Sequence, residues 1–554
     1  MKKALVELAP LRWNGARGEL LWARRLQVRL RFAGLEPSER TSSGSGGTRH
    51  REEKSHRSRT VLARLVASQP GLYRVSLPDV VRSPRRSRAS LRLSHLGESV
   101  PFHVESSTLY FLSGGDSVYE LQSGPGALLM PVLDGSPSGA PVGSLIGRVE
   151  REENHYYQAG LLDAPSIWLW DVLVSPSSKD FAFTIRDGVP DEAQLEVFLQ
   201  GASGFEGAPD HRVLLSVNGF PVGESVWDGM APMRFEAPLP AGVLRDGENQ
   251  LSIENAGSAA APYSMVFLDR FTVTYRRRAV AEIGSLEGRF DESGTVAVDA
   301  LSPGSVVIQT SPQTAWLQGV EGTSFHVEAG RSYLAVSPES VLQATILRPA
   351  TSGLRNTRNG ADYLLIGPRE FLPAAEPLLR QRQRQGLVAM GVAIEDVYDD
   401  FGFGEARPEA LKEFLEYAYH HWRGGAPRYV VLFGDATYDR KDYLQTGVRD
   451  RVPAWMRKTS YLWTASDPTY AAVNGEDELP DLALGRLPAA TLEEARTLVD
   501  KVLEYEASGQ SLSGRVVLVA DNPDAAGDFE KDSDEIAAGV GGREVQEIYL
   551  RELG

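Results

Sequence analysis

The sequence predicts a multidomain protein in which a β-sandwich-rich N-terminal part precedes an α/β domain with a mostly parallel, three-layer arrangement. A chain of 554 residues is too long for one domain of the usual size, about 100–200 residues. Up to about residue 355, short strands between turn residues alternate apolar with polar side chains. From residue 356, short apolar runs alternate with amphipathic helices, which favours a parallel sheet between helix layers.

The first section, residues 1–130, is predicted to be a β-rich domain. Strands bounded by Gly, Pro and Ser are expected at 26–32, 71–77 and 100–105. The basic tract TRHREEKSHRSR (48–59) follows TSSGSGG, and this composition predicts a disordered, solvated loop at about 40–60.

The middle section, residues 131–278, is predicted to be an accessory β-sandwich of a jelly-roll-like type. Its clearest alternating strands are 194–201, 211–219, 249–255 and 270–277. Such alternation buries one face of each antiparallel sheet and leaves the other in water. Asn218-Gly219 stands where a two-residue hairpin turn requires it. A smaller β domain is expected over 279–355.

The region after residue 356 is predicted to be α/β from its apolar runs and the helices between them. The runs are 362–367, 392–399, 429–433, 480–488, 515–521 and 544–550. A helix is expected over 407–422, with Pro408 in its first turn and one apolar face at helical spacing. Thr491 and Glu494 form a capping box that opens another helix.

The charge distribution is uneven along the chain. Of the 58 Lys and Arg, 21 lie in residues 1–100, against 8 of the 74 Asp and Glu, so this part carries +13 and the remainder −29. This asymmetry indicates docking of a basic N-terminal part on an acidic body, or contact with an anionic surface. Basic residues are not interleaved with aromatic residues, so nucleic acid is not expected as a partner. No apolar stretch approaches the ~20 residues of a membrane span, and no signal peptide is visible.

The residue types by themselves point to no catalytic apparatus. The chain contains no cysteine, which excludes disulfides, zinc–thiolate sites and a cysteine nucleophile within it. None of the nine histidines precedes a glycine, and the nucleophile-elbow, phosphate-loop and HExxH patterns are absent. His420 and His421 are expected to face solvent, and His211 and His326 to pack within β domains.

Carboxylates follow several apolar runs directly, as Asp399, Asp435 and Asp521 do. In open α/β sheets ligands bind beyond the carboxyl ends of the strands, so these positions suit a site. An aspartate there also caps turns by accepting hydrogen bonds from local backbone N–H groups, and this structural role is the competing interpretation.

A denser group of oxygen ligands lies on the predicted loops that follow the 429–433 run. Its calcium candidates are Asp435, Asp439, Asp467 and Asp477, with Asn474 and Asp481 nearby. Hard oxygen ligands suit calcium, although the spacing does not match the twelve-residue EF-hand loop. Solvated loop carboxylates without a metal are the alternative. No other cofactor is indicated.

A succession of motifs resembles the front half of the gingipain-type cysteine peptidase domain over about residues 360–550. The motifs are DYLLIG (362–367), VYDDFGFGEARPEALKEFLEYAYHHW (397–422), YVVLFGDATYD (429–439), ASDPTYA (465–471) and DLALGRLPAATLEEARTLVDKVLEYE (481–506). The preceding β-rich sections are similar to the propeptide-like and accessory domains of large members of that family.

The resemblance implies two caspase-like α/β subdomains, the first at 356–508 and the second beginning at 509–554. In that family the second subdomain carries a His-Gly histidine and a nucleophilic cysteine. This sequence is expected to end before both, so no catalytic residue is assigned. The implied function is the N-terminal portion of a secreted or cell-surface cysteine endopeptidase that acts on polypeptides, with the portion itself inactive.

The alternative is a non-catalytic surface or secreted protein that recognises carbohydrate or protein through its sandwich. Tyr156, Tyr157, Trp168 and Trp170 lie close together in sequence, and exposed aromatic rings stack on sugars. In sandwiches such residues also belong to the core. Exposure of the two tryptophans separates these interpretations.

Overall fold

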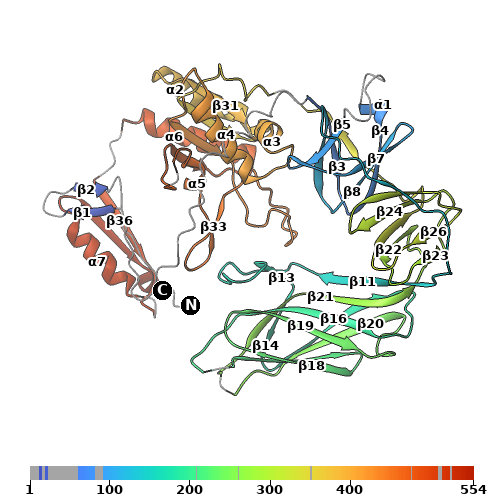
Figure 1. Ribbon diagram of the computed structural model, residues 1–554. Coiled ribbons are helices and arrows are strands. Elements are labelled where there is room, and N and C mark those ends of the chain that lie inside the picture. Colours follow the sequence, from blue (N-terminus) through green and yellow to red (C-terminus); the bar gives the residue numbers. More distant parts are fainter. Residues whose placement is uncertain are drawn as a thin grey trace, which may run out of the picture. The chain divides into compact units, whose positions relative to one another are not determined.

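A computed structural model describes residues 11–14, 19–22, 60–80, 91–207, 209–259, 261–349, 352–475, 477–509, 514–524 and 527–553. The predicted strand at 26–32 and the predicted loop at about 40–60 lie outside the described residues, apart from Thr60. Strands β1 (Leu11–Asn14) and β2 (Glu19–Trp22) pair as an antiparallel hairpin. The remainder confirms a multidomain, mostly β protein (Figure 1). No helix among the described residues has the length and apolar character needed to cross a membrane.

The first β region consists of two packed sheets. Its elements are β3 (Thr60–Ala67), β4 (Gly71–Ser76), α1 (Leu77–Val80), β5 (Leu91–His95), β6 (Glu98–Ser99), β7 (Phe102–Glu105), β8 (Thr108–Ser113) and β9 (Ser117–Ser123). Two distant strands, β28 (Leu342–Gln343) and β29 (Thr345–Leu347), join them, beside β4 and β3 respectively. Side chains from both sheets, such as Leu65 and Phe111, form one core.

The sandwich is built from two antiparallel layers. Its strands are β14 (Asp171–Val174), β15 (Ser177–Ile185), β16 (Ala193–Gly201), β17 (His211–Val217), β18 (Phe220–Trp227), β19 (Pro232–Leu239), β20 (Gly247–Asn255) and β21 (Met265–Arg278). One sheet has the order β15–β20–β17–β18, and β14, β21, β16 and β19 form the facing layer. Alternate residues of β16, β17 and β20, with residues of the other strands, enter a shared core that includes Trp170 and Phe271. The predicted hairpin is confirmed, because Asn218 and Gly219 have φ of 52° and 79°, as its turn requires.

The third β region continues the same sheet. Its strands are β10 (Val132–Asp134), β11 (Ser144–Glu152), β22 (Ser285–Arg289), β23 (Gly294–Ala297), β24 (Val306–Ser311), β25 (Ala315–Gln318), β26 (Ser324–Val327) and β27 (Ser332–Val336). Strand β11 pairs with β21 on one side and β22 on the other, so one sheet runs from the sandwich into this region. The predicted domain boundaries at residues 131, 279 and 356 stay predictions. Strand pairing crosses the boundaries at 131 and 279, since β28 pairs with β4 and β10 pairs with β25.

The α/β region contains a four-stranded parallel sheet in the order β31–β30–β32–β35. Its elements are β30 (Tyr363–Gly367), η3 (Arg369–Phe371), α2 (Leu372–Arg384), β31 (Ala389–Ala393), α3 (Ile394–Phe401), α4 (Pro408–His421), β32 (Tyr429–Phe433), the hairpin β33 (Met456–Lys458) and β34 (Trp463–Ala465), α5 (Pro468–Ala471), β35 (Ala483–Leu487) and α6 (Leu492–Ala507). The expected order of strands and helices is largely present.

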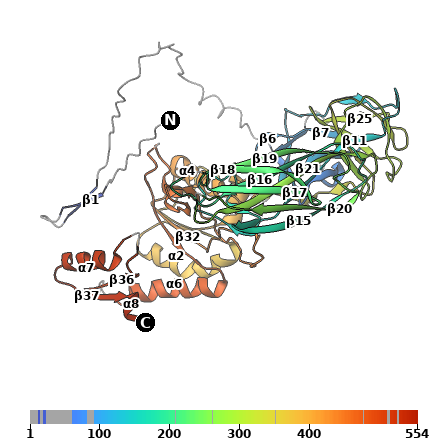
Figure 2. The same ribbon diagram turned by 90° about the horizontal axis from the view of Figure 1, so that it is seen from below.

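Helices cover both faces of this sheet, as Figure 2 shows for β32 between α4 on one side and α2 and α6 on the other. Leu364 and Ile366 pack against α3 and α4, whereas Leu365 packs against α2 and α6. This alternation is why the strands are apolar at nearly every position. Pro408 starts α4, and the capping box of Thr491 and Glu494 starts α6, both as predicted.

One predicted strand is wrong. The 392–399 run is not a strand, because β31 ends at Ala393 and residues 394–401 form α3. Ile394, Val397 and Phe401 are buried at a spacing of three and four residues, which is the helical period. Asp399 therefore lies on a helix and does not follow a strand.

A second parallel pair lies near the C-terminus. Strands β36 (Arg515–Ala520) and β37 (Glu544–Tyr549) are connected by α7 (Phe529–Gly539), and α8 (Leu550–Leu553) follows. The tyrosine hydroxyl of Tyr549 donates to Asp534 of α7, which ties the helix to one face of the pair. Val517 and Val519 of β36 are exposed.

Candidate functional site

The carboxyl ends of β30, β32 and β35 lie at one edge of the parallel sheet, where α/β proteins bind ligands. The interior strand β32 ends at Phe433 and leads into a long connection, residues 434–455. The predicted carboxylates of this connection are the natural candidates for chemistry.

Asp435 stands directly after Gly434 at the end of β32 and organises the backbone around it. Its side-chain Oδ1 accepts from the N–H of Ala436 at 2.9 Å. Its own N–H donates to the carbonyl of Ala489, and its carbonyl accepts from the N–H groups of Arg451 and Val452. Of these contacts the one with Ala436 involves the carboxylate, and a loop-organising role of the Asp435 side chain stays a prediction.

Asp439 is the most buried of the candidates, with 4% of its surface exposed. Its two carboxylate oxygens each accept a backbone hydrogen bond at 2.8 Å, from Tyr443 and Leu444. Two N–H donors aimed at one carboxylate stabilise the turn 439–444.

Asp467 pairs with an arginine from the LGRLP motif. The Arg486 guanidinium contacts both oxygens of Asp467, at 2.6 and 2.8 Å. Its remaining donors reach the carbonyls of Gly434, Val452 and Pro453 at 2.7–3.2 Å. One side chain therefore joins β35, the end of β32 and the SDPTYA segment, and this contact accounts for both motifs.

The last candidate, Asp477, accepts from the N–H of Leu479 at 3.2 Å. Nearby Asp481 accepts from the N–H groups of Val473 and Asn474. Within the part of the chain that the structure describes, no three Asp, Glu or His side chains come together as metal ligands would. Asp435, Asp439, Asp467 and Asp477 thus do not form one coordination sphere here, and calcium binding stays a prediction.

Sequence reasoning missed Asp450, which lies beside the same edge. Burial raises the pKa of this carboxyl, and the nearby Arg440 opposes the shift. Its Oδ2 accepts from Arg440 Nε at 3.1 Å. Burial also raises the pKa of Tyr398 far above its usual value, with Asp450 adding to the shift. The segment TGVRDRVPAW has no periodicity, so nothing in the sequence distinguished this residue.

Asp399 contacts the first β region instead of the sheet edge. The Arg64 guanidinium donates to its carboxylate and to its carbonyl, and also contacts Glu120. Burial raises the pKa of Asp399, and Arg64 opposes this shift. Close by, Glu405 accepts from the N–H of Val118 at 2.9 Å and contacts His95 Nε2 at 3.1 Å.

The four clustered aromatic residues have different surroundings. Trp170 is 9% exposed and packs on Phe181 and Phe271 in the sandwich core. Trp168 and Tyr157 instead pack against tyrosines of the connection after β32. Burial raises the pKa of the Tyr157 phenol, with the Tyr438 phenol adding to the shift. Both tryptophans therefore have aromatic neighbours, and Trp170 is buried in the sandwich core.

His211, His420 and His421 lie as expected, whereas His326 of β26 (Ser324–Val327) is half-buried, with Nδ1 3.0 Å from Ser138. His420 and His421 are exposed on α4. His211 is fully buried, with its ring nitrogens within hydrogen-bond distance of Ser264 Oγ (2.7 Å) and the Gly229 carbonyl (3.0 Å). His211 is therefore a core residue in which both ring nitrogens have hydrogen-bond partners.

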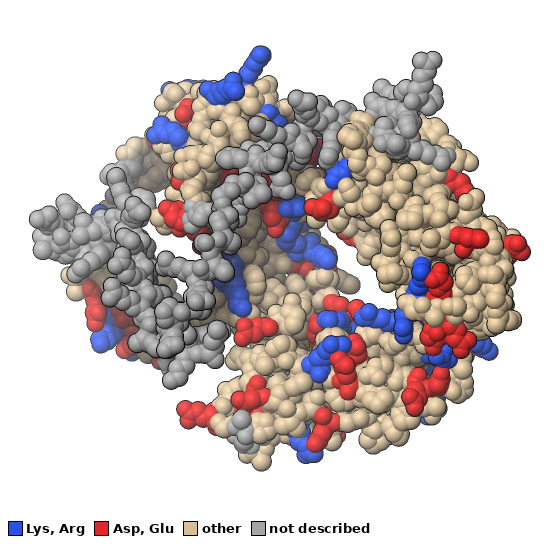
Figure 3. Space-filling view, viewed as in Figure 1, with Lys and Arg blue, Asp and Glu red and all other residues tan. Residues whose placement is uncertain are grey.

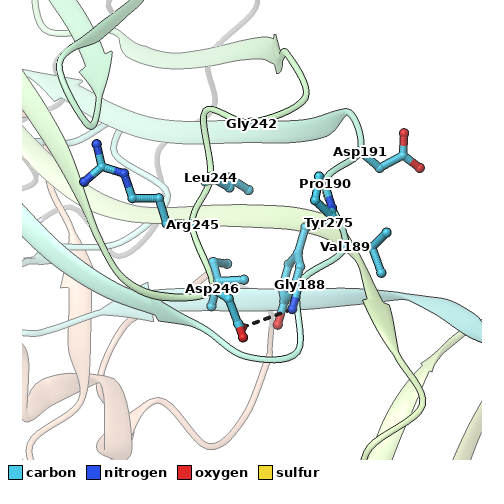
Figure 4. A pocket seen from close by; sticks show the side chains of 10 residues that line it. Gly188, Val189, Pro190, Asp191, Gly242, Leu244, Arg245, Asp246 and Tyr275 are labelled. Carbon is cyan, nitrogen blue, oxygen red and sulfur yellow. Dashed lines mark hydrogen bonds between the residues drawn. The ribbon is translucent and has the colours of Figure 1, made fainter.

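The surface charge of the sandwich is mixed, and a pocket at one of its ends is small. On the face shown in Figure 3, acidic and basic side chains are interspersed over the sandwich, consistent with pairs such as Arg148–Glu150 and Arg276–Asp191. Figure 4 shows a pocket of about 120 Å³ at one end of the sandwich, where the N–H of Gly188 donates to Asp246. A pocket of this size holds only a few water molecules.

Comparison with known proteins places this edge in a family. Residues 356–553 match the model of Peptidase family C25. Dimeric latent PorU from Porphyromonas gingivalis is similar in structure, with a TM-score of 0.56 and 16% identity, over 80% of this chain and 49% of that chain. This chain thus spans about half the length of PorU, and at this identity the likeness shows the fold alone.

Other similarities are weaker. A structure described as a protease shares 24% identity over 30% of this chain and 33% of its own, with a TM-score of 0.22. A β-porphyranase of glycoside hydrolase family 86 from Bacteroides plebeius shares 12% sequence identity over 34% of this chain and 30% of its own, with a TM-score of 0.16. Neither score supports an argument. No curated protein is significantly similar to the chain. Residues 356–553 therefore belong to Peptidase family C25, the gingipain-type family that the sequence resembles.

Proposed function

We propose that this chain is the N-terminal portion of a gingipain-like cysteine endopeptidase, supplying its accessory β regions and the first α/β subdomain. The observation that carries the proposal is the parallel sheet β31–β30–β32–β35, covered on both faces, within the region that matches family C25. The substrate class is polypeptide. A secreted or cell-surface location is proposed with it, by the same resemblance.

Two caspase-like subdomains belong to this proposal, the first at 356–508 and the second beginning at 509–554. The β36–β37 pair supports an incomplete second subdomain. Parallel sheets are normally buried on both faces, yet among the described residues α7 covers one face of this pair. On the other face, Val517 is 50% and Val519 73% exposed. Further strands and a helix layer would cover these valines.

The chemistry proposed for the complete enzyme needs groups that this chain does not contain. A thiolate attacks the peptide carbonyl and a histidine transfers the proton. The chain has no cysteine and no His-Gly pair. Removing a nucleophile or its base costs about 10⁶ in kcat, so this chain alone should be inactive.

Purified chain incubated with fluorescent casein and with dipeptidyl reporters tests the inactivity. The expected result is no turnover above the rate of a mock preparation purified in parallel. Turnover that follows the 60.5 kDa species through successive columns, and that thiol-blocking reagents leave unchanged, would contradict the proposal.

The nucleotide sequence past codon 554 tests the family assignment of the whole protein. A continuing frame that encodes a His-Gly pair and a later cysteine is the expected result. An immediate stop in the native gene would favour the alternative, a non-catalytic surface or secreted binding protein. That alternative has less support, because Trp168 and Trp170 are both packed against other rings.

Docking of the basic N-terminal part on the acidic body remains a separate proposal. Most of residues 1–59 lies outside the described residues, so the charge asymmetry is its support. Salt-dependent release of a proteolytically cleaved N-terminal fragment would sustain it, because interactions between exposed charges weaken as salt rises.

A further inference from the structure

A loop of the sandwich, residues 153–170, is placed against the α/β region. It contains the short hairpin of β12 (Tyr156–Tyr157) and β13 (Trp168–Leu169). Its base is fixed to the sandwich, since Trp170 enters the core and Tyr156 packs on Phe267. The loop is thus a rigid projection from the accessory region.

Two aromatic side chains of this projection meet two tyrosines of the connection after β32. The rings of Tyr157 and Tyr438 lie 4.5 Å apart between centroids. Trp168 stacks on Tyr438 at 6.1 Å and meets Tyr443 edge-on at 5.0 Å. These separations fall within the range of favourable aromatic pairs.

Polar contacts join the same projection to the β33–β34 hairpin. The N–H of Trp463 donates to the carbonyl of Ala159 at 2.9 Å. Lys458 Nζ donates to the carbonyl of Leu162 at 2.5 Å and lies 3.5 Å from Asp163. The projection therefore contacts two consecutive parts of the crossover between β32 and β35.

The connection after β32 has little packing of its own between Arg440 and Arg449. In this stretch every side chain is exposed except that of Tyr443, which is half-buried. Asp439 fixes the turn at its start and Asp450 its end, but neither buries apolar surface within the stretch. Tyr443 reaches its burial partly against Trp168, a residue of the sandwich.

We propose that the 153–170 projection is a positioning element that orders the 434–455 connection at the carboxyl edge of the C25 sheet. Trp168 is its principal positioning residue. The sandwich then works as a fixed part of the peptidase unit and not as an independent recognition module. That the ordered connection borders the path of a polypeptide substrate rests on the proposed function.

Hydrogen–deuterium exchange of the full 554-residue chain tests the proposal. In Trp168→Ala, amides of residues 436–449 should exchange about tenfold faster or more, since the two ring pairs of Trp168 with Tyr438 and Tyr443 are lost. Amides of β30 and β32 should keep the parent rate. Tyr263→Ala is the matched control, because Tyr263 is an exposed ring of the same sandwich that packs on Phe205. Its exchange in 436–449 should equal that of the parent.

A second variant, Tyr438→Ser, removes the contact from the opposite side. Tyr438 is 51% exposed on a loop, so the variant keeps the sandwich core intact. It decides the outcome if Trp168→Ala unfolds the sandwich as a whole. Unchanged exchange of 436–449 in Tyr438→Ser, or parent rates in a folded Trp168→Ala, would overturn the proposal. The readout needs no peptidase activity, so failure here is distinct from failure of the proposed function.

Discussion

The chain contains two parallel sheet segments that differ in how they are covered. In β30, Leu364, Leu365 and Ile366 are all 0% exposed, because helices lie on both faces. In β36 the valines that face away from α7 are open to solvent. The sequences YLLIG and RVVLVA are nearly equally apolar, so the difference comes from the layers around them.

This comparison shows that a run of apolar residues specifies a strand, and that burial depends on what is packed against it. The carboxyl ends of the two segments also differ. At the end of β32 and β35, Arg486 joins several connections. After β36, the carboxylate of Asp521 accepts from the N–H of the adjacent Asn522.

The largest loss of stability is expected from a substitution that removes contacts at the edge of the covered sheet. Arg486→Met leaves the Asp467 carboxylate without its guanidinium and uncouples the carbonyls of Gly434 and Val452. We expect a loss of about 3 kcal/mol of stability, the usual result of removing one partner of a largely buried ion pair. Urea unfolding, with exchange of β32 amides as the local readout, measures it.

The control for Arg486→Met is Asp521→Asn at the end of the open pair. It should stay within about 0.5 kcal/mol of the parent, as surface changes usually do. Equal losses in the two variants would show that Arg486 does not organise the edge.

An intermediate effect comes from the same valine-to-alanine change in the two segments. Val430 in β32 is 1% exposed, and Val430→Ala should cost about 2 kcal/mol through lost burial and a residual cavity. Val519→Ala should cost less than about 0.5 kcal/mol, since that side chain already contacts water. Exchange of the amides in each strand reports the two values separately. A loss of 2 kcal/mol at Val519 would mean that its face is covered in solution.

The smallest effect concerns the helix layer that only the covered sheet has. Arg382 of α2 donates to both carboxylate oxygens of Glu506 in α6, at 2.9 and 2.7 Å, and these hydrogen bonds lower the pKa of Glu506. Because the pKa of Glu506 is lower in the folded state, the ion pair stabilises the protein at pH values above the usual pKa of 4.5. This contribution is lost as the pH falls through the folded-state pKa. Because the pair is partly exposed, the contribution should be about 0.5 kcal/mol.

Glu506→Gln should therefore melt below the parent at neutral pH and converge with it in acid. The gap should also narrow in high salt, which screens the pair. Glu504→Gln, at an exposed carboxylate two residues earlier, is the control. A gap that grew as the pH fell would contradict the assignment.

Local features of the fold were predictable from sequence because they depend on neighbouring residues. The Asn218-Gly219 turn needs two residues with positive φ, and the box of Thr491 and Glu494 spans four residues. The 392–399 run was misassigned because a short stretch with apolar residues at Val392, Ile394 and Val397 suits a strand or one face of a helix. The pairing of β11 with two distant strands has no local pattern, so the shared sheet was not foreseen.

The candidate site was predictable in position but not in its contacts. Asp435 follows an apolar strand, and that pattern is visible in sequence. The pairing of Asp467 with Arg486 joins residues 19 positions apart, and Trp168 meets Tyr438 across 270 positions. Such pairs are set by tertiary packing, which one sequence does not encode in any short window.

The return of β28 and β29 to the first β region has a consequence for biosynthesis. Thr345, Ile346 and Leu347 pair with Val66, Leu65 and Arg64. Strand β3 of the first β region is therefore completed on this side by residues synthesised some 280 positions later. Domains made at the ribosome generally fold as units in the order of their synthesis. Here the nascent N-terminal sheet keeps an unpaired edge until translation passes residue 347, and a chaperone has that interval in which to shield it.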